Sequence, residues 1–201
     1  MVYRESFDKP DSTTLGPDLS WTEISNDLQV VSNRARCVNL NVNSYARADA
    51  AVAGSDMYAR MTVTTFPATG AGTTNRAAGV CARCDASGAV TFYMARVIHL
   101  LASGFNYQLF KLVAAAPTQL GSNVPVTLSL PEVIQIECLG STIICRRNGV
   151  SVIAANDTAI PTGLRGGIRL FEFENVANTE IDSFEVGDVA YATALQYGVG
   201  V

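Results

Sequence analysis

Two acidic side chains stand two residues apart late in the chain, in the run Phe171-Glu172-Phe173-Glu174. If this run is a strand, Glu172 and Glu174 share one face about 6.5 Å apart, a separation at which a carboxylate pair can cleave a glycosidic bond. The alternative is ordinary strand alternation, in which Phe171 and Phe173 fill a core and both glutamates are solvated. The first interpretation makes the protein a glycoside hydrolase, and the second makes it a non-catalytic domain.

The five cysteines are Cys37, Cys81, Cys84, Cys138 and Cys145. Cys81 and Cys84 form a Cys-x-x-Cys pair, but structural zinc needs four nitrogen or sulfur ligands and the sequence has no second pair. On a strand, positions i and i+3 point to opposite faces, so we expect these two thiols not to converge. An odd count without a signal peptide argues against a disulfide framework. We therefore expect all five thiols to be reduced core residues.

No catalytic motif stands out elsewhere. The single histidine, His99, lies in the apolar run Val97-Ile98-His99-Leu100-Leu101, where a lone imidazole is more often packed with one hydrogen bond than used as a base. The sequence contains no Gly-x-Ser-x-Gly elbow and no phosphate-binding loop. We therefore expect a protein without enzymatic activity.

Composition limits the partners. The chain has 201 residues, 48% of them hydrophobic and 16% charged, which suits one well-buried domain. Its formal net charge of −4 leaves no basic excess for nucleic acid or for an anionic membrane. No apolar run is long enough to span a membrane, and residues 1–10 carry four charges where a signal peptide needs an apolar stretch. We expect a soluble protein made in the cytoplasm.

The clearest elements are three strands between residues 133 and 155. They are separated by Gly140-Ser141 and by Asn148-Gly149, and Asn-Gly is typical of a type I′ turn because both of its central residues need positive φ. Pairing across the first turn sets Cys138 opposite Ile143 and Ile136 opposite Cys145. The sequence therefore predicts a β-meander.

The strongest strand of the first half covers residues 57–66, with Met57, Ala59, Met61 and Val63 on its core face. Other strands are predicted at 21–24, 28–31, 35–40, 76–84, 90–97, 107–113, 126–130, 166–174 and 181–186. Residues 67–75 and 117–125 read as loops, and residues 43–56 as a loop or a weak strand. About thirteen short strands with little helix predict an all-β fold, a two-sheet antiparallel β-sandwich in one domain over residues 1–188.

Three stretches resemble the concanavalin A-like jelly rolls of phage and prophage virion proteins. These are Phe7-Asp8-Lys9-Pro10-Asp11-Ser12 with Leu15-Gly16 and Trp21 behind it, the run from Ile134 through Asn148-Gly149 to Gly167, and the closing Ile181-Asp182-Ser183-Phe184-Glu185-Val186-Gly187-Asp188. Lys9 stands where the pattern usually has Arg. The resemblance implies a concanavalin A-like jelly roll, a fold that serves many functions.

The resemblance also implies a non-enzymatic structural protein located in the virion, either a capsid decoration protein or a tail or fibre component. Its partners would be other virion proteins and further copies of itself as a homo-oligomer. The alternatives are a glycan-binding adhesin that contacts a host surface glycan and, second, a glycoside hydrolase.

Three groups of residues are candidate sites. Aromatic and polar side chains that could bind a glycan are Tyr58, Arg60, Tyr93, Arg96 and Tyr107. No cofactor is expected apart from calcium, which lectin-like sandwiches often bind at loop edges and for which Asp85, Asn156 and Asp157 are candidates. The tail, residues 189–201, carries no charge, and we expect it to dock on a neighbouring subunit or a capsid shell through Tyr191, Leu195, Tyr197 and Val201.

Overall fold

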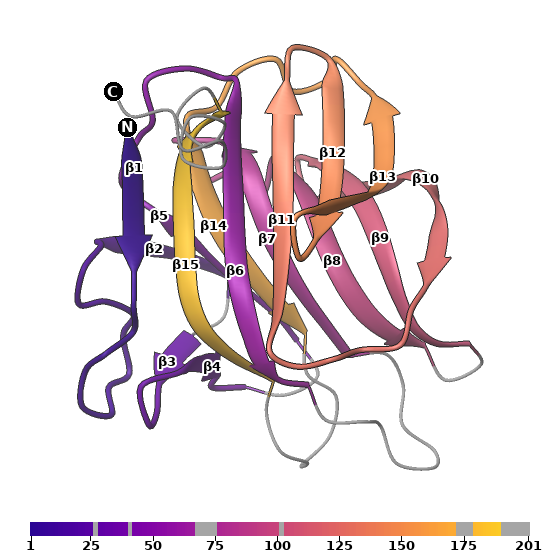
Figure 1. Ribbon diagram of the computed structural model, residues 1–201. Helices are drawn as coiled ribbons and strands as arrows, with labels where there is room; N and C mark the ends of the chain where they lie inside the picture. The colour runs from indigo at the N-terminus through magenta and orange to yellow at the C-terminus, as the bar shows by residue number, and fades with distance from the viewer. Residues whose placement is uncertain (26–27, 40–41, 67–75, 101–102, 172–178, 190–201) are drawn as a thin grey trace, which may run out of the picture.

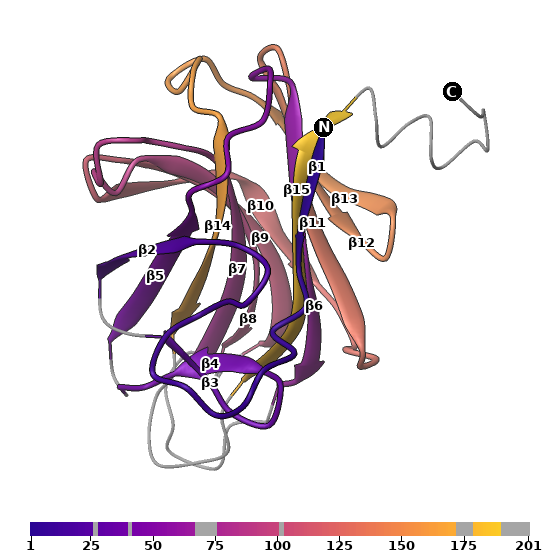
Figure 2. The same cartoon turned by 90° about the vertical axis from the view of Figure 1, so that its left-hand side faces the viewer.

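The computed structural model describes residues 1–25, 28–39, 42–66, 76–100, 103–171 and 179–189. Within them, fifteen strands form two antiparallel sheets that lie face to face, with essentially no helix (Figures 1 and 2). The predicted all-β sandwich is therefore confirmed, with more strands than the thirteen or so expected. No helix in these ranges is long and apolar enough to cross a membrane.

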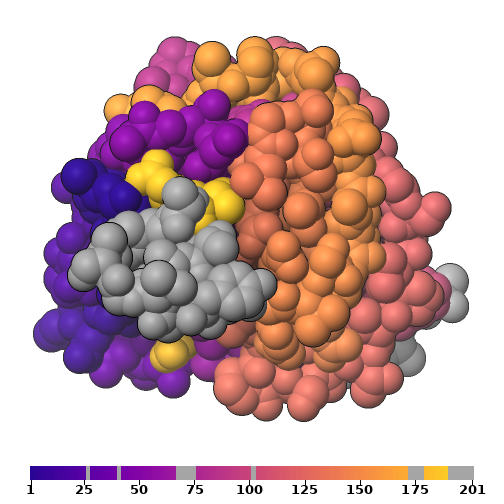
Figure 3. Space-filling view, turned by 45° about the horizontal axis from the view of Figure 1, so that its top comes forward, coloured from indigo at the N-terminus to yellow at the C-terminus, as the bar shows by residue number. Residues whose placement is uncertain are grey.

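The sheet nearer the viewer in Figure 1, called sheet A, has eight strands. They are β1 (Val2–Glu5), β3 (Leu28–Val30), β4 (Ala35–Cys37), β6 (Met57–Thr65), β11 (Glu132–Leu139), β12 (Thr142–Arg147), β13 (Val150–Asn156) and β15 (Glu180–Asp188). Their order is β13-β12-β11-β6-β15-β4-β3, and β1 also pairs with β15. The meander strands β11 to β13 form one continuous stretch of this surface, coloured salmon to orange in Figure 3.

The second sheet, called sheet B, has seven strands. They are β2 (Trp21–Ser25), β5 (Asn43–Ala48), β7 (Arg76–Cys84), β8 (Phe92–Leu100), β9 (Gly104–Val113), β10 (Ala116–Pro125) and β14 (Arg165–Phe171). Their order is β10-β9-β8-β7-β14-β5-β2, so β14, a strand from late in the chain, lies between β7 and β5 from its first half. Residues 43–56, predicted as a loop or a weak strand, begin with a strand, because residues 43–48 form β5.

The meander prediction is confirmed in its register. Cys138 pairs with Ile143 and Ile136 pairs with Cys145. Asn148 and Gly149 have φ values of 48° and 82°, as a type I′ turn requires.

Two sequence predictions about the end of sheet B are wrong. Residues 117–125, predicted as a loop, form most of β10, and residues 126–130, predicted as a strand, contain none. The cause is the turn before β10, where Ala114 and Ala115 have positive φ values of 47° and 67°. Alanine rarely adopts this conformation, so no residue preference marks this tight hairpin in the sequence.

The core lies between the two sheets. Met57, Ala59, Met61 and Val63 are each at most 1% exposed, as predicted for the inner face of β6. The irregular N-terminal segment is attached to this core through Trp21, whose ring meets that of Phe184 edge-on at 5.1 Å.

All five cysteines are free and buried, as predicted. The prediction that Cys81 and Cys84 face opposite sides of the sheet is wrong, because both lie in one apolar cluster with Tyr45 on the outer face of sheet B. Arg83, between them, has a φ of 53°, and the register of β7 against β14 shifts at this point. The bulge rotates the strand and returns Cys84 to the face of Cys81.

Candidate functional site

The five predicted glycan-binding residues do not form one row. Tyr58 and Arg60 lie on the outer face of sheet A, since the neighbouring Met57 and Ala59 point to the core. Tyr93 and Tyr107 are fully buried between the sheets. Arg96 lies on the outer face of sheet B, the side opposite to Tyr93. The row predicted from the sequence is therefore split over three surfaces.

Tyr93 and Tyr107 serve the core instead of a ligand. The Tyr107 hydroxyl donates a hydrogen bond to Glu132, a carboxylate that is only 1% exposed. The Tyr93 hydroxyl donates to Asp157 at 2.7 Å and accepts from the Ile160 amide at 3.1 Å. Burial, followed by the bond to Asp157, raises the pKa of Tyr93 to about 12. The prediction that these two side chains face a glycan is wrong.

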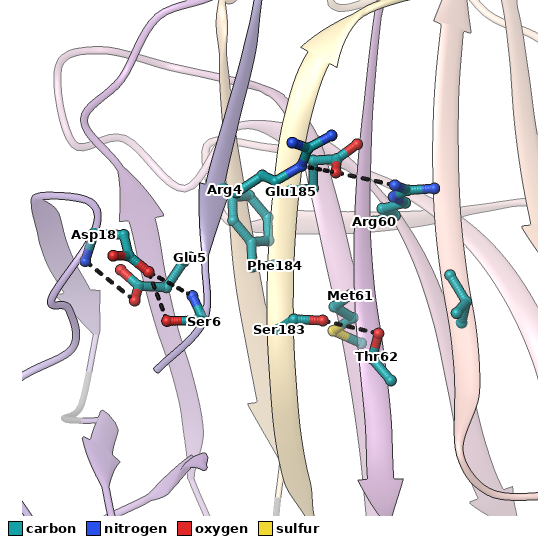
Figure 4. A pocket seen from close by; sticks show the side chains of 11 residues that line it. Arg4, Glu5, Ser6, Asp18, Arg60, Met61, Thr62, Ser183, Phe184 and Glu185 are labelled. Atoms are coloured by element: carbon teal, nitrogen blue, oxygen red, sulfur yellow. Dashed lines mark hydrogen bonds and ion pairs between the residues drawn. The ribbon is translucent and has the colours of Figure 1, made fainter. Parts of the chain in front are cut away.

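Arg60 borders a pocket of about 430 Å³ on the outer face of sheet A (Figure 4). Beside it, the Glu185 carboxylate accepts hydrogen bonds from the Tyr58 hydroxyl, from Arg4 Nε at 2.7 Å and from Arg60 at 3.0 Å. Burial raises the pKa of Glu185, but these three donors outweigh burial and leave the pKa below its ordinary value.

The other carboxylates of this pocket also have partners within the protein. Glu5 accepts from the Leu19 amide at 2.9 Å and from Trp21 Nε1 at 3.1 Å. Asp18 accepts from the Ser6 hydroxyl at 2.6 Å (Figure 4). These bonds attach the irregular N-terminal segment to β1. The carboxylates that line the pocket are therefore bonded to donors within the protein, and we interpret them as a structural network.

The calcium candidates lie at a loop end of the sandwich. Asp157 accepts hydrogen bonds on one oxygen from Tyr93 and on the other from Lys111 at 2.5 Å. Asp85 accepts from the Ser87 amide at 2.6 Å, and Asn156 accepts from the Thr142 hydroxyl at 3.2 Å. The described residues contain no group of three or more His, Cys, Asp or Glu that could hold a metal ion.

A second pocket, of about 560 Å³, opens at this end between the β7–β8 loop and residues 159–165. Its base is Arg83, whose buried guanidinium donates to the carbonyl oxygens of Ser55, Ile160 and Gly140 at 2.8–3.0 Å. This arginine acts as an internal brace, because all three of its nitrogens donate to backbone carbonyl oxygens.

Several predicted residues lie outside the described part of the chain. They are Glu172 and Glu174 of the carboxylate pair, and Tyr191, Leu195, Tyr197 and Val201 of the tail. The hydrolase and tail-docking hypotheses therefore stay predictions.

The outer face of sheet B carries a row of side chains that the sequence analysis did not assemble. Strand pairing places Tyr45 beside Arg169, Arg169 beside Gly79, Gly79 beside Arg96, and Arg96 beside Gln108. These five residues, one each from β5, β14, β7, β8 and β9, are called the arginine row. Residues paired directly across antiparallel strands share a face, so the row crosses the middle of the sheet as a line.

The polar half of the row is ordered by hydrogen bonds and stacking. Arg96 Nε donates to Gln108 Oε1 at 2.8 Å, and the Gln108 amide donates to Asn123 on β10 at 2.8 Å. The Arg96 guanidinium lies over the Phe110 ring, 4.3 Å from its centroid. The ring contact and the hydrogen bond to Gln108 fix the position of the guanidinium, and among the described residues only its Nε donates a hydrogen bond.

Arg96 and Arg169 have no ionic partner. Both side chains are half-buried, and neither forms an ion pair anywhere in the part of the chain that the structure describes. Burial, followed by the positive charge of Arg169, lowers the pKa of Arg96 to about 10, and burial also lowers the pKa of Arg169. Both remain cationic at neutral pH, so the row presents two positive charges without a compensating carboxylate.

The end of the row at Tyr45 is apolar in its surroundings. The Tyr45 hydroxyl is buried and makes no hydrogen bond of normal geometry, and burial raises its pKa. Tyr45 packs against Cys81, Cys84 and Phe92, its ring 4.6 Å from that of Phe92. The row therefore passes from a hydrophobic cluster at β5 to the Gln108 amide at β9, which is hydrogen-bonded to the exposed Asn123 of β10.

Known proteins resemble this chain in structure and not in sequence. No protein-family model matches the sequence, and no curated protein matches it. A carbohydrate-binding module, CBM66 from Bacillus subtilis, superimposes with a TM-score of 0.62 at 17% identity over 84% of this chain and 94% of its own. A Bacillus licheniformis beta-glucanase does so with a TM-score of 0.61 at 8% identity, over 92% and 97%.

A legume lectin-like domain from Entamoeba histolytica matches with a TM-score of 0.58 at 13% identity, over 83% of this chain and 88% of its own. At such low identity these likenesses show the fold alone. The chain has the concanavalin A-like jelly-roll fold, as the sequence resemblance implied.

Proposed function

We propose that this protein is a non-catalytic glycan-binding module whose binding surface is the outer face of sheet B. The observation that carries the proposal is the arginine row, in which the half-buried Arg96 and Arg169 and the buried Gln108 lie in register on one face. Structural neighbours that are named as a carbohydrate-binding module and as a lectin-like domain support a role of this kind.

The chemistry of the row suits a sugar. Binding a sugar requires a few fixed polar groups for its hydroxyls beside an apolar surface for its ring faces. Gln108 and Asn123 are amides already oriented by their mutual hydrogen bond, and Phe110 and Arg96 present a stacked flat surface next to them. Little rotamer freedom is left to lose on binding, which favours affinity.

The two other hypotheses, a glycoside hydrolase and a virion structural protein, have less structural support. A beta-glucanase is among the structural neighbours, but the carboxylate pair that motivates hydrolysis lies outside the described residues. The virion structural role, with its virion partners, homo-oligomeric state and location, is a prediction from the sequence resemblance, and no structural observation favours it. Glycan binding is therefore the function that we infer first.

The test is affinity electrophoresis of the full chain against a panel of neutral and acidic polysaccharides. We expect at least one polysaccharide to retard the protein, and Arg96→Gln to weaken that retardation tenfold or more because it removes both the charge and the stacking over Phe110. Arg146→Gln is the matched control: Arg146 is also half-buried, but it lies on sheet A and is paired with Glu137 at 2.8 Å.

Two outcomes would contradict the proposal. If no polysaccharide retards the protein, the proposal of glycan binding is wrong. Retardation that is lost in Arg60→Gln and kept in Arg96→Gln would move the site to the pocket on sheet A.

A further inference from the structure

We propose that the ligand of the arginine row is anionic, a glycan bearing a carboxylate or a sulfate group that is held between Arg96 and Arg169. The inference rests on the proposed function and specifies its substrate class. It starts from the two positive charges that the fold places on one face without a carboxylate partner among the described residues.

Two buried arginines show how this protein compensates a guanidinium elsewhere. Arg83, 2% exposed, donates to three backbone carbonyl oxygens. Arg47, 7% exposed, donates to the carbonyl oxygens of Asp85 and Ala86 at 2.8 Å and lies 3.2 Å from the Asp49 carboxylate. A buried cation without such compensation is costly to the folded state.

Arg169 departs from this pattern. Its side chain makes no hydrogen bond and no ion pair with the part of the chain that the structure describes, although it is half-buried. Arg96 has a single hydrogen bond, to the neutral amide oxygen of Gln108. Uncompensated groups of this kind are expected at functional sites, where a ligand supplies the missing partner.

The strand between them carries no side chain of its own at the paired position. Gly79 separates Arg169 from Arg96 in the register and contributes no side chain. A Cβ at this position would lie 2.7 Å from the Met94 sulfur, so the thioether of Met94 lies over Gly79 as an apolar floor. An oxyanion above that floor would meet a guanidinium on either side, and each guanidinium can donate two parallel hydrogen bonds to it.

The net charge of the chain indicates that the row recognises one or two anionic groups through short-range contacts and does not attract a polyanion through a long-range electrostatic field. The formal net charge is −4, so there is no long-range field to attract nucleic acid. Recognition must therefore come from short-range contacts with one or two charged groups per site. Partial burial strengthens those contacts, because the effective dielectric constant is lower there than in water.

Isothermal titration calorimetry of the full chain with three oligosaccharide series tests the inference. The series are oligogalacturonates with carboxylates, carrageenan oligosaccharides with sulfate esters, and neutral galacto-oligosaccharides of equal length. We expect one of the charged series to bind at least tenfold more tightly than the neutral one, and its affinity to fall as salt is raised. The series that binds identifies the anionic group.

The variants Arg169→Gln and Arg169→Lys separate recognition of charge from folding. Arg169→Gln should weaken binding of the charged series tenfold or more and leave the melting temperature unchanged or raised, because it removes an uncompensated cation and breaks no bond within the protein. Arg169→Lys should keep most of the preference for charged ligands. Arg146→Gln, on sheet A, should change neither affinity nor salt dependence.

The outcomes distinguish this inference from the proposed function. Equal binding of neutral and charged series, with no change in Arg169→Gln, would overturn the inference and leave glycan binding intact. Tight binding of the charged series that is equally strong in Arg169→Gln would also overturn it. If none of the three series binds, the inference is wrong. If, in addition, no polysaccharide of the wider electrophoresis panel retards the protein, the proposed function is wrong as well.

Discussion

Gly163 occupies a position at which even one added carbon is forbidden, and Gly163→Ala therefore tests the packing of the loop end. Its φ is +120°, in a region that L-residues with a Cβ rarely adopt. A Cβ built there would lie 2.4 Å from the carbonyl oxygen of Arg83 and 2.6 Å from its carbonyl carbon. Both are backbone atoms, so no change of rotamer can relieve the clash.

The magnitude follows from two separate effects. Overpacking a close-packed site typically costs about 1–3 kcal/mol, and holding a residue in a sparsely populated φ/ψ region costs about 1–3 kcal/mol. Their sum predicts a loss of about 4 kcal/mol in the free energy of unfolding, a large fraction of the roughly 5–15 kcal/mol of an ordinary domain. The backbone of β7 at Arg83 must shift if the loss is smaller.

Urea unfolding followed by tryptophan fluorescence measures this loss, since the chain has a single tryptophan, Trp21, at the edge of the core. Gly54→Ala is the matched control, because the nearest atom to its Cβ is 4.0 Å away and its φ is not positive. We expect the control to change stability by less than about 1 kcal/mol. A loss below about 1 kcal/mol in Gly163→Ala, or an equal loss in the control, would refute the reasoning.

Three further predictions concern other parts of the sandwich. Tyr107→Phe should lower the free energy of unfolding by about 1.5–3 kcal/mol, measured in urea, because the buried Glu132 carboxylate loses a donor. The pKa of Glu185 is held below its ordinary value of 4.5, so this group adds stability above that pH and loses it on acidification through the lower folded pKa. Glu185→Gln should therefore show a shallower fall in stability below about pH 4.5 than the parent protein, and an unchanged slope would contradict this. Burial raises the pKa of Cys138 and Cys145 to about 12, so a thiol reagent at neutral pH should label neither in the folded protein and both in denaturant.

Local patterns in the sequence predicted those parts of the fold in which neighbouring residues decide the outcome. The two-residue turn at Gly140-Ser141 predicted the register of β11 against β12, because so short a turn leaves one way to pair the flanking strands. Alternation in β6 also predicted its core face, because apolar residues on one side of the strand alternate with more polar residues on the other.

Prediction failed where both faces of a strand are apolar or where the backbone departs from its regular path. In β8, Phe92 and Met94 pack in the cluster on the outer face, and Tyr93 packs in the core, so alternation cannot tell the faces apart. The positive φ of Arg83 in β7 is a similar case, because no residue preference marks it in the sequence.

The candidate site shows the same division between sequence and structure. Local patterns were enough to predict a sandwich of antiparallel strands and to place Arg96 and Arg169 on strands, because period-two alternation is a local property. That the two arginines lie on one face with Gly79 between them depends on the tertiary structure. Strand order and register arise from contacts between segments far apart in the chain, and through them β14 pairs with β7 and places near each other two arginines that have no carboxylate partner among the described residues.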